Sequence, residues 1–369
     1  MLYRRMPIEL ESPEEFGYDK IRYNLAESSV TDAVLSGTDF DLSGIVLAYG
    51  DHRGNPELRE LIARESSDLV PDSVLVTPGA AAALFAVNTT LLEKGSHMIV
   101  AHPNYATNIE TPRAIGAEVV FFGLRFEDEW RVEPDRLASM MRPDTKLVSM
   151  TSPHNPTGTV MSKDVLEKII ELVEKNRCYL LFDETYRDLC YESPLPVAAS
   201  LSDRVISVSS MSKSYGFPGI RIGWLICQDQ DLMERFLAAK EQMVICNSVL
   251  DESIALQVFR QKGKFLNKFR DTTREGLDIV SDWINRENAV EWIKPSGGVV
   301  AFVHIARTVD LDIDRFYTVL LEDYKTFVGP GHWFEMDRRF MRIGFGWTNS
   351  EDLQQGLDNI SKAIRDSRV

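Results

Sequence analysis

Seven short apolar runs, separated by loops and helical stretches, constrain the fold of this chain more than any other feature. Val, Ile, Leu and Phe are frequent in them, as in strands buried on both faces of a mostly parallel sheet. Apolar residues recur at helical spacing between several runs, most clearly over residues 164–176. This alternation predicts an α/β fold, with a mostly parallel seven-stranded sheet flanked by helices over residues 45–250. The expected strands are Val74–Thr77, Met98–Ala101, Glu118–Phe122, Lys146–Met150, Tyr179–Phe182, Val205–Ser209 and Ile222–Cys227.

A second, smaller α+β domain is expected over residues 251–369. A chain of 369 residues exceeds the size at which one hydrophobic core usually keeps growing. Residues 1–44 lack a strong period and are expected to form an arm that packs on the small domain or on a neighbouring subunit. The elements expected after residue 250 are a helix over 251–285 interrupted near Gly263, a strand, a turn and a strand over 289–305, a helix over 313–324, a strand over 340–345 and a final helix over 351–365.

Charge and composition exclude several classes of partner. The net charge of −15 argues against nucleic acid and anionic membranes as partners, because both attract basic surfaces. No apolar run is long enough to span a bilayer, and no signal peptide is recognisable, so a cytoplasmic location is expected. The four cysteines lack CxxC spacing and the six histidines lack ligand spacing, so neither disulfides nor a metal site are expected.

The stretch SMSKSYGFPGIRIGW places one lysine among small hydroxyl side chains. Ser210 and Ser212 precede and adjoin Lys213, and Arg221 follows eight positions later. Hydroxyls and a guanidinium suit a phosphate dianion. Nearby positive charge and desolvation lower the pKa of an amine, which favours a Schiff base with an aldehyde. The alternatives are a solvated lysine and a surface ion pair for Arg221.

An acid and a tyrosine follow a strand in the stretch CYLLFDETYRD. Asp183 ends the strand and is expected at the carboxyl edge of the sheet, where ligands bind in such folds. A buried carboxylate there needs a partner, and a protonated pyridine nitrogen is a suitable one. Tyr186 lies three residues after Asp183, so its hydroxyl could hydrogen-bond a phenolic oxygen on the same pyridine ring. The alternative for Asp183 is a helix N-cap.

Three further loops follow predicted strands. Asn155 lies in SPHNPTG, where prolines and a glycine dictate a rigid turn, and its amide can donate to the same phenolic oxygen. Gly79 precedes a helix in LVTPGAAAALFAV, so the amides of Ala80 and Ala81 are expected to face an anion. Tyr105 in HPNYATN can stack on a ring. Each loop alone is also compatible with a purely structural turn or with core packing.

Taken together, these residues match the needs of pyridoxal 5'-phosphate (PLP). Its aldehyde needs an amine, supplied by Lys213. Its pyridine nitrogen needs an anion, supplied by Asp183. Its phosphate needs a guanidinium, supplied by Arg221. PLP then acts as an electron sink for carbanion chemistry.

The order of these motifs along nearly the whole chain resembles the fold-type I PLP-dependent aminotransferases, the class I/II family around aspartate aminotransferase. The resemblance implies a transfer of an amino group between an L-amino acid and a 2-oxo acid. The roles that it implies are the Schiff base with PLP for Lys213, the pyridinium partner for Asp183, contacts to the ring oxygen for Tyr186 and Asn155, and phosphate contacts for Ser210, Ser212, Arg221, Ala80 and Ala81.

The same resemblance assigns two residues outside the cofactor loops. Arg342, in FMRIGFGW, matches the arginine that binds the substrate α-carboxylate. Tyr49, in YGDHRGNPELRE, matches a tyrosine that reaches the phosphate of the neighbouring subunit. A homodimer with shared active sites is therefore expected.

Two departures from the family pattern lie on the substrate side. Glu27 and Ser28, in NLAESSV, stand where family members carry a glycine-containing segment over the substrate. Asn108 stands where a second aromatic residue often follows the stacking tyrosine. A carboxylate at Glu27 favours a basic or polar amino acid over an acidic one, unless Glu27 faces solvent on the arm.

Two alternatives to transamination stay open. A PLP-dependent lyase, or a cyclase such as capreomycidine synthase acting on an arginine-like substrate, would share every cofactor residue. A non-enzymatic effector domain of a transcription regulator would need a fused DNA-binding domain, and the first forty residues show no helix-turn-helix pattern.

Overall fold

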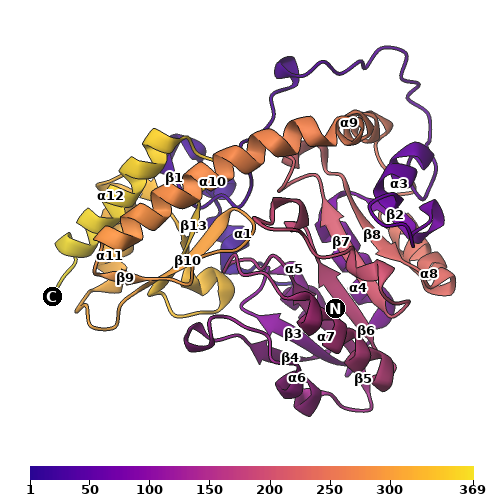
Figure 1. Ribbon diagram of the computed structural model, residues 1–369, viewed down its shortest axis with the longest axis horizontal. Coiled ribbons are helices and arrows are strands. Elements are labelled where there is room, and N and C mark those ends of the chain that lie inside the picture. Colours follow the sequence, from indigo (N-terminus) through magenta and orange to yellow (C-terminus); the bar gives the residue numbers. More distant parts are fainter.

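The computed structural model describes residues 1–369, and a seven-stranded sheet forms the centre of its larger part (Figure 1). The strand order is β2-β8-β7-β6-β5-β3-β4, and β8 runs antiparallel to both of its neighbours while the other pairs are parallel. All seven predicted strands are confirmed, with each end within one residue of its expected place. The strands are β2 (Val74–Thr77), β3 (His97–His102), β4 (Glu118–Gly123), β5 (Thr145–Thr151), β6 (Tyr179–Asp183), β7 (Val205–Ser210) and β8 (Gly223–Cys227).

Helices cover both faces of this sheet because successive strand residues point to opposite sides. Leu147 and Leu181 share a core with α4, α5 and α8, whereas Val148 and Leu180 share another with α6 and α7. A third core joins α3 and α9 to β2 and β8. The helices are α3 (Pro56–Ala63), α4 (Gly79–Leu91), α5 (Thr107–Ile115), α6 (Pro134–Met140), α7 (Lys163–Asn176), α8 (Gln230–Glu241) and α9 (Val249–Arg260).

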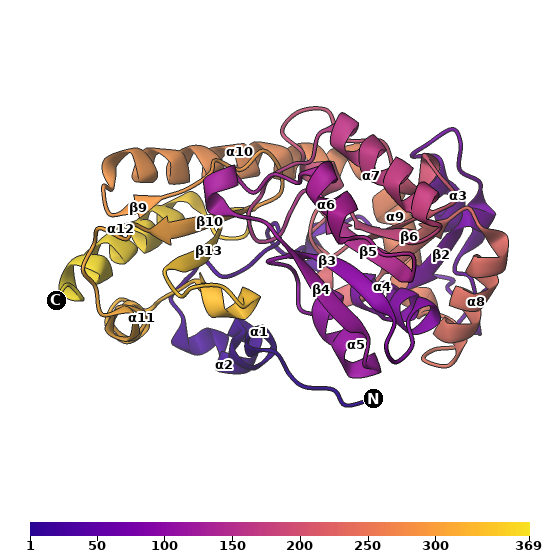
Figure 2. The same cartoon turned by 90° about the horizontal axis from the view of Figure 1, so that it is seen from below.

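The C-terminal part contains a four-stranded antiparallel sheet of order β12-β13-β10-β9, with helices packed against it. The predicted interruption near Gly263 is two residues too late: α9 ends at Arg260, and α10 contains Gly263. The long helix α10 bridges the two parts (Figures 1 and 2), since Leu266 packs with α9 and Trp283 packs in the C-terminal core. The elements are α10 (Lys262–Arg286), β9 (Val290–Glu291), β10 (Val300–Ile305), α11 (Ile313–Glu322), β12 (Gly329–Pro330), β13 (Phe340–Gly344) and α12 (Ser350–Asp366).

The N-terminal arm packs on this C-terminal part (Figure 2). Its strand β1 (Tyr23–Asn24) pairs in parallel with β11 (Thr326–Phe327), and Phe16 stacks on Phe327 with ring centroids 5.7 Å apart. The arm also carries the short helices α1 (Pro7–Glu11) and α2 (Pro13–Phe16). The middle of the arm therefore packs on the small domain, one of its two expected positions. Tyr3, Phe40 and Leu42 pack on the large part instead, which was not expected. The predicted boundaries at residues 44 and 250 stay predictions.

No helix in the chain combines the length and the apolar character needed to cross a bilayer. The four cysteines are free thiols, and Cys178 and Cys227 are buried.

Candidate active site

A cavity of about 520 Å³ lies at the carboxyl ends of the central strands. Thr151, Asp183 and Ser210 end β5, β6 and β7, and all three line it. Parallel strands bring their carboxyl ends to one edge of a sheet, where such folds bind ligands. Of the residues predicted for the site, the cavity is lined by Glu27, Ala80, Ala81, Tyr105, Asn155, Asp183, Tyr186, Ser210, Ser212, Lys213, Arg221 and Arg342, but not by Gly79 or Tyr49.

Ser28 of the N-terminal arm holds two predicted site residues. Its hydroxyl Oγ accepts a hydrogen bond from Lys213 Nζ at 3.1 Å, and its carbonyl oxygen accepts one from Tyr186 Oη at 2.7 Å. Burial lowers the pKa of the Lys213 amine, and the charges of Arg342 and Arg221 lower it further, against the opposing carboxylate of Glu27. The motif reading noted Ser28 only as a departure from glycine and missed this contact, which joins residues 185 positions apart.

Asp183 is buried at the end of β6 and caps a turn, not a helix. Its Oδ1 accepts hydrogen bonds from the Thr185 backbone N at 3.1 Å and from Thr185 Oγ1 at 2.7 Å. Burial raises the pKa of the Asp183 carboxyl, and hydrogen bonds from Thr185 and Asn108 partly offset that rise. Asn108, on α5, thus contacts the predicted pyridinium partner from the side. A cation bound in the cavity would keep this carboxyl ionised.

The start of α4 meets Arg221 in a tight contact that needs glycine. A Cβ on Gly79, whose φ is +80°, would lie 2.5 Å from Arg221 Nη2. A Cβ on Gly223 would lie 2.5 Å from the Ala80 backbone N. Arg221 itself has a left-handed φ of 49°, forms no ion pair, and donates from Nη1 to Ser212 Oγ at 3.3 Å and to the Pro218 carbonyl oxygen at 2.9 Å. A guanidinium beside a helix N-terminus is a suitable environment for a phosphate.

Arg342 on β13 brings the C-terminal part to the cavity. Its side chain is buried, with the residue only 4% exposed. Nη1 donates to Asn155 Oδ1 at 3.1 Å and Nη2 donates to the Ala26 carbonyl oxygen at 2.7 Å. Nε is buried and has no hydrogen-bond partner. The guanidinium lines the cavity and has no ion-pair partner, so an anionic group in the cavity would be a suitable partner.

The arm closes the cavity on the side opposite the sheet. Glu27 is half-buried, and its Oε1 accepts a hydrogen bond from Tyr18 Oη at 3.1 Å and one from Asn24 Nδ2 at 3.5 Å. Glu27 also lines the cavity, and its predicted role toward a substrate stays a prediction. Glu14 of α2 also lines the cavity and escaped the sequence reasoning, because nothing in a short arm helix signals contact with a distant sheet edge.

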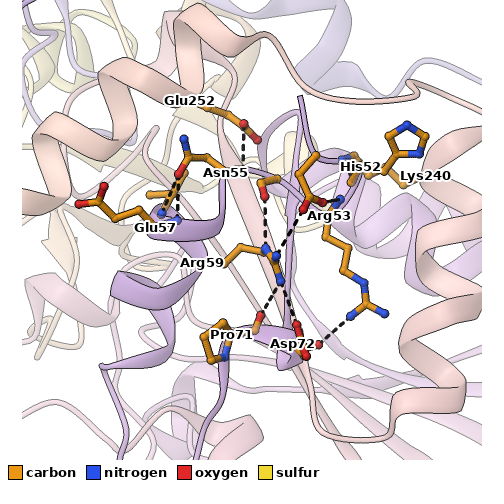
Figure 3. A network of polar contacts seen from close by, with 12 residues as sticks. His52, Arg53, Asn55, Glu57, Arg59, Pro71, Asp72, Lys240 and Glu252 are labelled. Carbon is orange, nitrogen blue, oxygen red and sulfur yellow. Dashed lines mark hydrogen bonds and ion pairs between the residues drawn. The ribbon is translucent and has the colours of Figure 1, made fainter. Parts of the chain in front are cut away.

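Tyr49 lies outside the cavity and is 83% exposed. The residues directly after it are held by a polar network around Arg59 (Figure 3). Arg59 Nε donates to the Gly54 carbonyl oxygen at 3.2 Å, and Nη1 donates to the Pro71 carbonyl oxygen at 3.1 Å. Glu252 Oε2 accepts from the Asn55 backbone N at 3.1 Å (Figure 3). Within a single chain, Tyr49 therefore does not reach the cavity of its own subunit. The network around Arg59 nevertheless fixes the segment that follows Tyr49.

The donor set fits PLP. A buried amine, a buried carboxyl and a guanidinium over a glycine at a helix N-terminus match the aldehyde, ring nitrogen and phosphate of this cofactor. The Arg221 guanidinium can approach Gly79, and the start of α4 can approach Gly223, only because neither glycine has a Cβ. The fold and the site thus define a fold-type I PLP-dependent enzyme.

Comparison with known proteins places the chain in a family. It belongs to the aminotransferase class I and II family, whose model matches residues 20–360, and this family depends on PLP. Capreomycidine synthase of Streptomyces vinaceus is 29% identical over 93% of this chain and 87% of its own length. The arginine–pyruvate transaminase AruH of Pseudomonas aeruginosa is 30% identical over 78% of this chain and 74% of its own length. The crystal structure of a PLP-dependent aminotransferase from Streptococcus suis superposes with a TM-score of 0.92 and 31% identity over 100% of both chains.

Proposed function

We propose that this protein is a cytoplasmic PLP-dependent aminotransferase that transfers an amino group between an L-amino acid and a 2-oxo acid. The observation that carries the proposal is the convergence of Lys213, Asp183, Arg221 and Arg342 on one cavity. When bound, PLP supplies an aldehyde and an electron sink for the carbanion formed next to the amino group.

Lys213 is the proposed Schiff-base lysine and proton carrier. Burial lowers the pKa of its amine, so Nζ is more readily neutral and can act as a nucleophile or accept the Cα proton of the substrate. Ser28 Oγ, 3.1 Å from Nζ, limits the directions in which the amine can point.

Arg342 is the proposed binding group for the substrate α-carboxylate. Arg342 lines the cavity, and a guanidinium offers a fork of donors that matches two carboxylate oxygens. Asn155 Oδ1 and the Ala26 carbonyl oxygen hold the guanidinium in place, at 3.1 and 2.7 Å.

Asp183, Tyr186 and the Arg221 region are the proposed contacts of the cofactor itself. Asp183 would face the ring nitrogen, because its buried carboxyl needs a cation to stay ionised. Burial raises the pKa of Tyr186 to about 12, so its hydroxyl remains a hydrogen-bond donor at neutral pH. The phosphate would be held by Arg221, Ser210, Ser212 and the Ala80 and Ala81 amides, and Tyr105 would lie against the ring.

The test is a half-reaction without a 2-oxo acid. The PLP-loaded protein is mixed with single L-amino acids, and the cofactor is identified by absorbance and mass spectrometry. Transamination converts the cofactor stoichiometrically to pyridoxamine phosphate, and addition of a 2-oxo acid restores PLP. Consumption of the amino acid with the cofactor left as PLP throughout contradicts the proposal.

A PLP-dependent cyclase or lyase is the second candidate. The relative named capreomycidine synthase favours it, because its alignment covers 93% of this chain. Every cofactor contact above serves that chemistry equally, because a carbanion next to the amino group is common to both. Mass spectrometry of the product in the same experiment separates the two. A 2-oxo acid that keeps the whole side chain, formed together with pyridoxamine phosphate, marks transamination. A cyclic product, or a 2-oxo acid that has lost a side-chain group and is released with ammonia while the cofactor stays PLP, marks the second candidate.

A further inference from the structure

Four carboxylates of the arm line the cavity without an ion-pair partner: Glu9, Glu14, Glu27 and Asp32. Glu27 accepts hydrogen bonds only from neutral groups, the hydroxyl of Tyr18 and the amide of Asn24. Glu14 on α2 forms neither an ion pair nor a hydrogen bond with its side chain, although it lines the same cavity. Its neighbour Glu15, by contrast, pairs with Arg5 at 3.3 Å.

The charged residues deeper in the cavity already have a role in the proposed function, including Lys213 as the Schiff-base lysine. Arg221 serves the phosphate, Asp183 the ring nitrogen, and Arg342 the α-carboxylate of the substrate. Arg342 lines the same cavity, where Asn155 and the Ala26 carbonyl oxygen hold its two Nη groups. Glu14 and Glu27 are therefore left as excess negative charge when cofactor and α-carboxylate are bound.

The two carboxylates act on the interior of the site. Glu27 and Glu14 both raise the pKa values of the Lys213 amine and of the Arg342 guanidinium, each against the larger effect of burial. Asp32, another carboxylate lining the cavity, accepts a hydrogen bond from Trp347 Nε1 at 2.8 Å and adds to the negative charge. An acidic side chain entering the cavity would meet like charge, which is strongly disfavoured.

We propose that the substrate is an L-amino acid with a cationic side chain, and that Glu27, with Glu14 at the rim, binds its distal ammonium or guanidinium group. This proposal rests on the proposed function, since it takes the α-carboxylate to lie on Arg342. The side chain then extends from the cofactor toward the arm, so arginine, lysine and ornithine define the substrate class. Tyr18 is a positioning residue, because its hydroxyl orients the Glu27 carboxylate.

The experiment compares L-arginine with L-citrulline, its uncharged analogue of nearly equal shape. Apparent dissociation constants come from titrating the absorbance of the PLP-loaded protein, and turnover is followed separately. We expect arginine to bind at least about tenfold more tightly than citrulline, and aspartate to bind more weakly than either. Equal affinity for arginine and citrulline overturns the proposal.

Variants of Glu27 and Glu14, with a matched control, test whether these residues cause the preference for arginine over citrulline. Glu27→Gln should reduce the arginine-to-citrulline ratio of affinities about tenfold, and the more exposed Glu14→Gln about threefold. Asp19→Asn removes an equal charge from an exposed residue that does not line the cavity, and should leave the ratio unchanged. Glu27→Asp, which keeps the charge, should retain most of the preference and shows that the arm still folds.

The outcomes separate this proposal from the proposed function. An unchanged ratio in the Glu14→Gln, Glu27→Gln double variant overturns the role of these carboxylates. If arginine binds more tightly than citrulline but never yields pyridoxamine phosphate, transamination fails and the substrate class stands. If alanine or aspartate is transaminated in preference to arginine, the substrate class fails and transamination stands.

Discussion

At the scale of single residues, Lys213 is the position on which the cofactor chemistry depends. Lys213→Ala should abolish covalent attachment of PLP while leaving the fold intact, because the side chain's single polar contact is the hydrogen bond to Ser28. Borohydride reduction followed by peptide mapping measures the attachment. Cofactor fixed to another lysine in the unmodified protein would show the assignment to be wrong.

A substitution of Arg342 tests whether the substrate carboxylate binds to this guanidinium. Arg342→Lys loses the fork of donors and the hydrogen bonds to Asn155 and Ala26. The resulting fall in kcat/KM for the amino acid should correspond to about 1.5–3 kcal/mol of lost binding free energy, mostly through a higher KM. PLP affinity should barely change. Arg338→Lys, at a partly exposed position on the approach to β13, is the control and should leave the kinetics unchanged. Equal damage to PLP affinity would place Arg342 elsewhere.

Glu184 gives the protein a pH-dependent stability that has no direct part in the chemistry. It is 4% exposed, and burial raises its pKa to about 7. Between about pH 4.5 and 7 the folded state holds a proton that the unfolded state has released, so this residue's contribution to stability is present below that window and lost as the pH rises through it.

Glu184→Gln cannot titrate, so its free energy of unfolding relative to the natural protein should rise by about 3 kcal/mol between pH 4.5 and 8. Denaturant unfolding of both proteins across this range measures the difference. The control is Glu192→Gln at an exposed position, which should show no such trend. A constant gap for Glu184→Gln would contradict the raised pKa.

At the scale of elements, the contact between the start of β8 and the start of α4 forms the predicted phosphate site. Gly223→Ala would place a Cβ 2.5 Å from the Ala80 backbone N, which must push the helix start away from Arg221. We expect a loss of about 1–3 kcal/mol in the free energy of unfolding, and weaker PLP binding. Gly219→Ala is the matched control, because a Cβ there meets nothing within 4 Å. Unchanged PLP affinity in Gly223→Ala would show that the amides of α4 do not bind the phosphate.

At the scale of the whole molecule, the segment before α3 favours a homodimer. Tyr49 is 83% exposed, and its neighbours Val46 and Leu47 are 77% and 81% exposed, which is unusual for adjacent large apolar residues in a monomer. The Arg59 network anchors the residues that follow Tyr49, so the exposed segment is attached to an ordered part of the surface (Figure 3). A symmetric partner would cover it and receive Tyr49 at its phosphate site.

Light scattering should give twice the chain mass of 41.9 kDa, and Tyr49→Phe should weaken PLP binding without dissociating the dimer. The loss should be about 0.5–1.5 kcal/mol, the usual net value of one hydrogen bond. A monomer that is fully active at low concentration would exclude the shared site.

The seven strands of the large sheet, and the loops that carry the predicted cofactor residues, could be predicted from local patterns in the chain. This follows from local physics: short β-branched and aliphatic runs define buried strands, and a residue just after such a strand lies at the sheet edge. Asp183 and Ser210 are of this kind, since each ends a strand that was recognisable on its own.

The distant residues that complete the cavity could not be predicted in this way, because tertiary packing brings them together. Ser28 meets Lys213 across 185 positions, and Arg342 meets Asn155 across 187. The reversed direction of β8 and the place of Glu14 at the cavity mouth are of the same kind. No period in the sequence encodes them, because they depend on how the arm and the C-terminal sheet pack against the large one. The local sequence pattern predicts the helices and strands. The burial of their apolar faces determines which of them pack together.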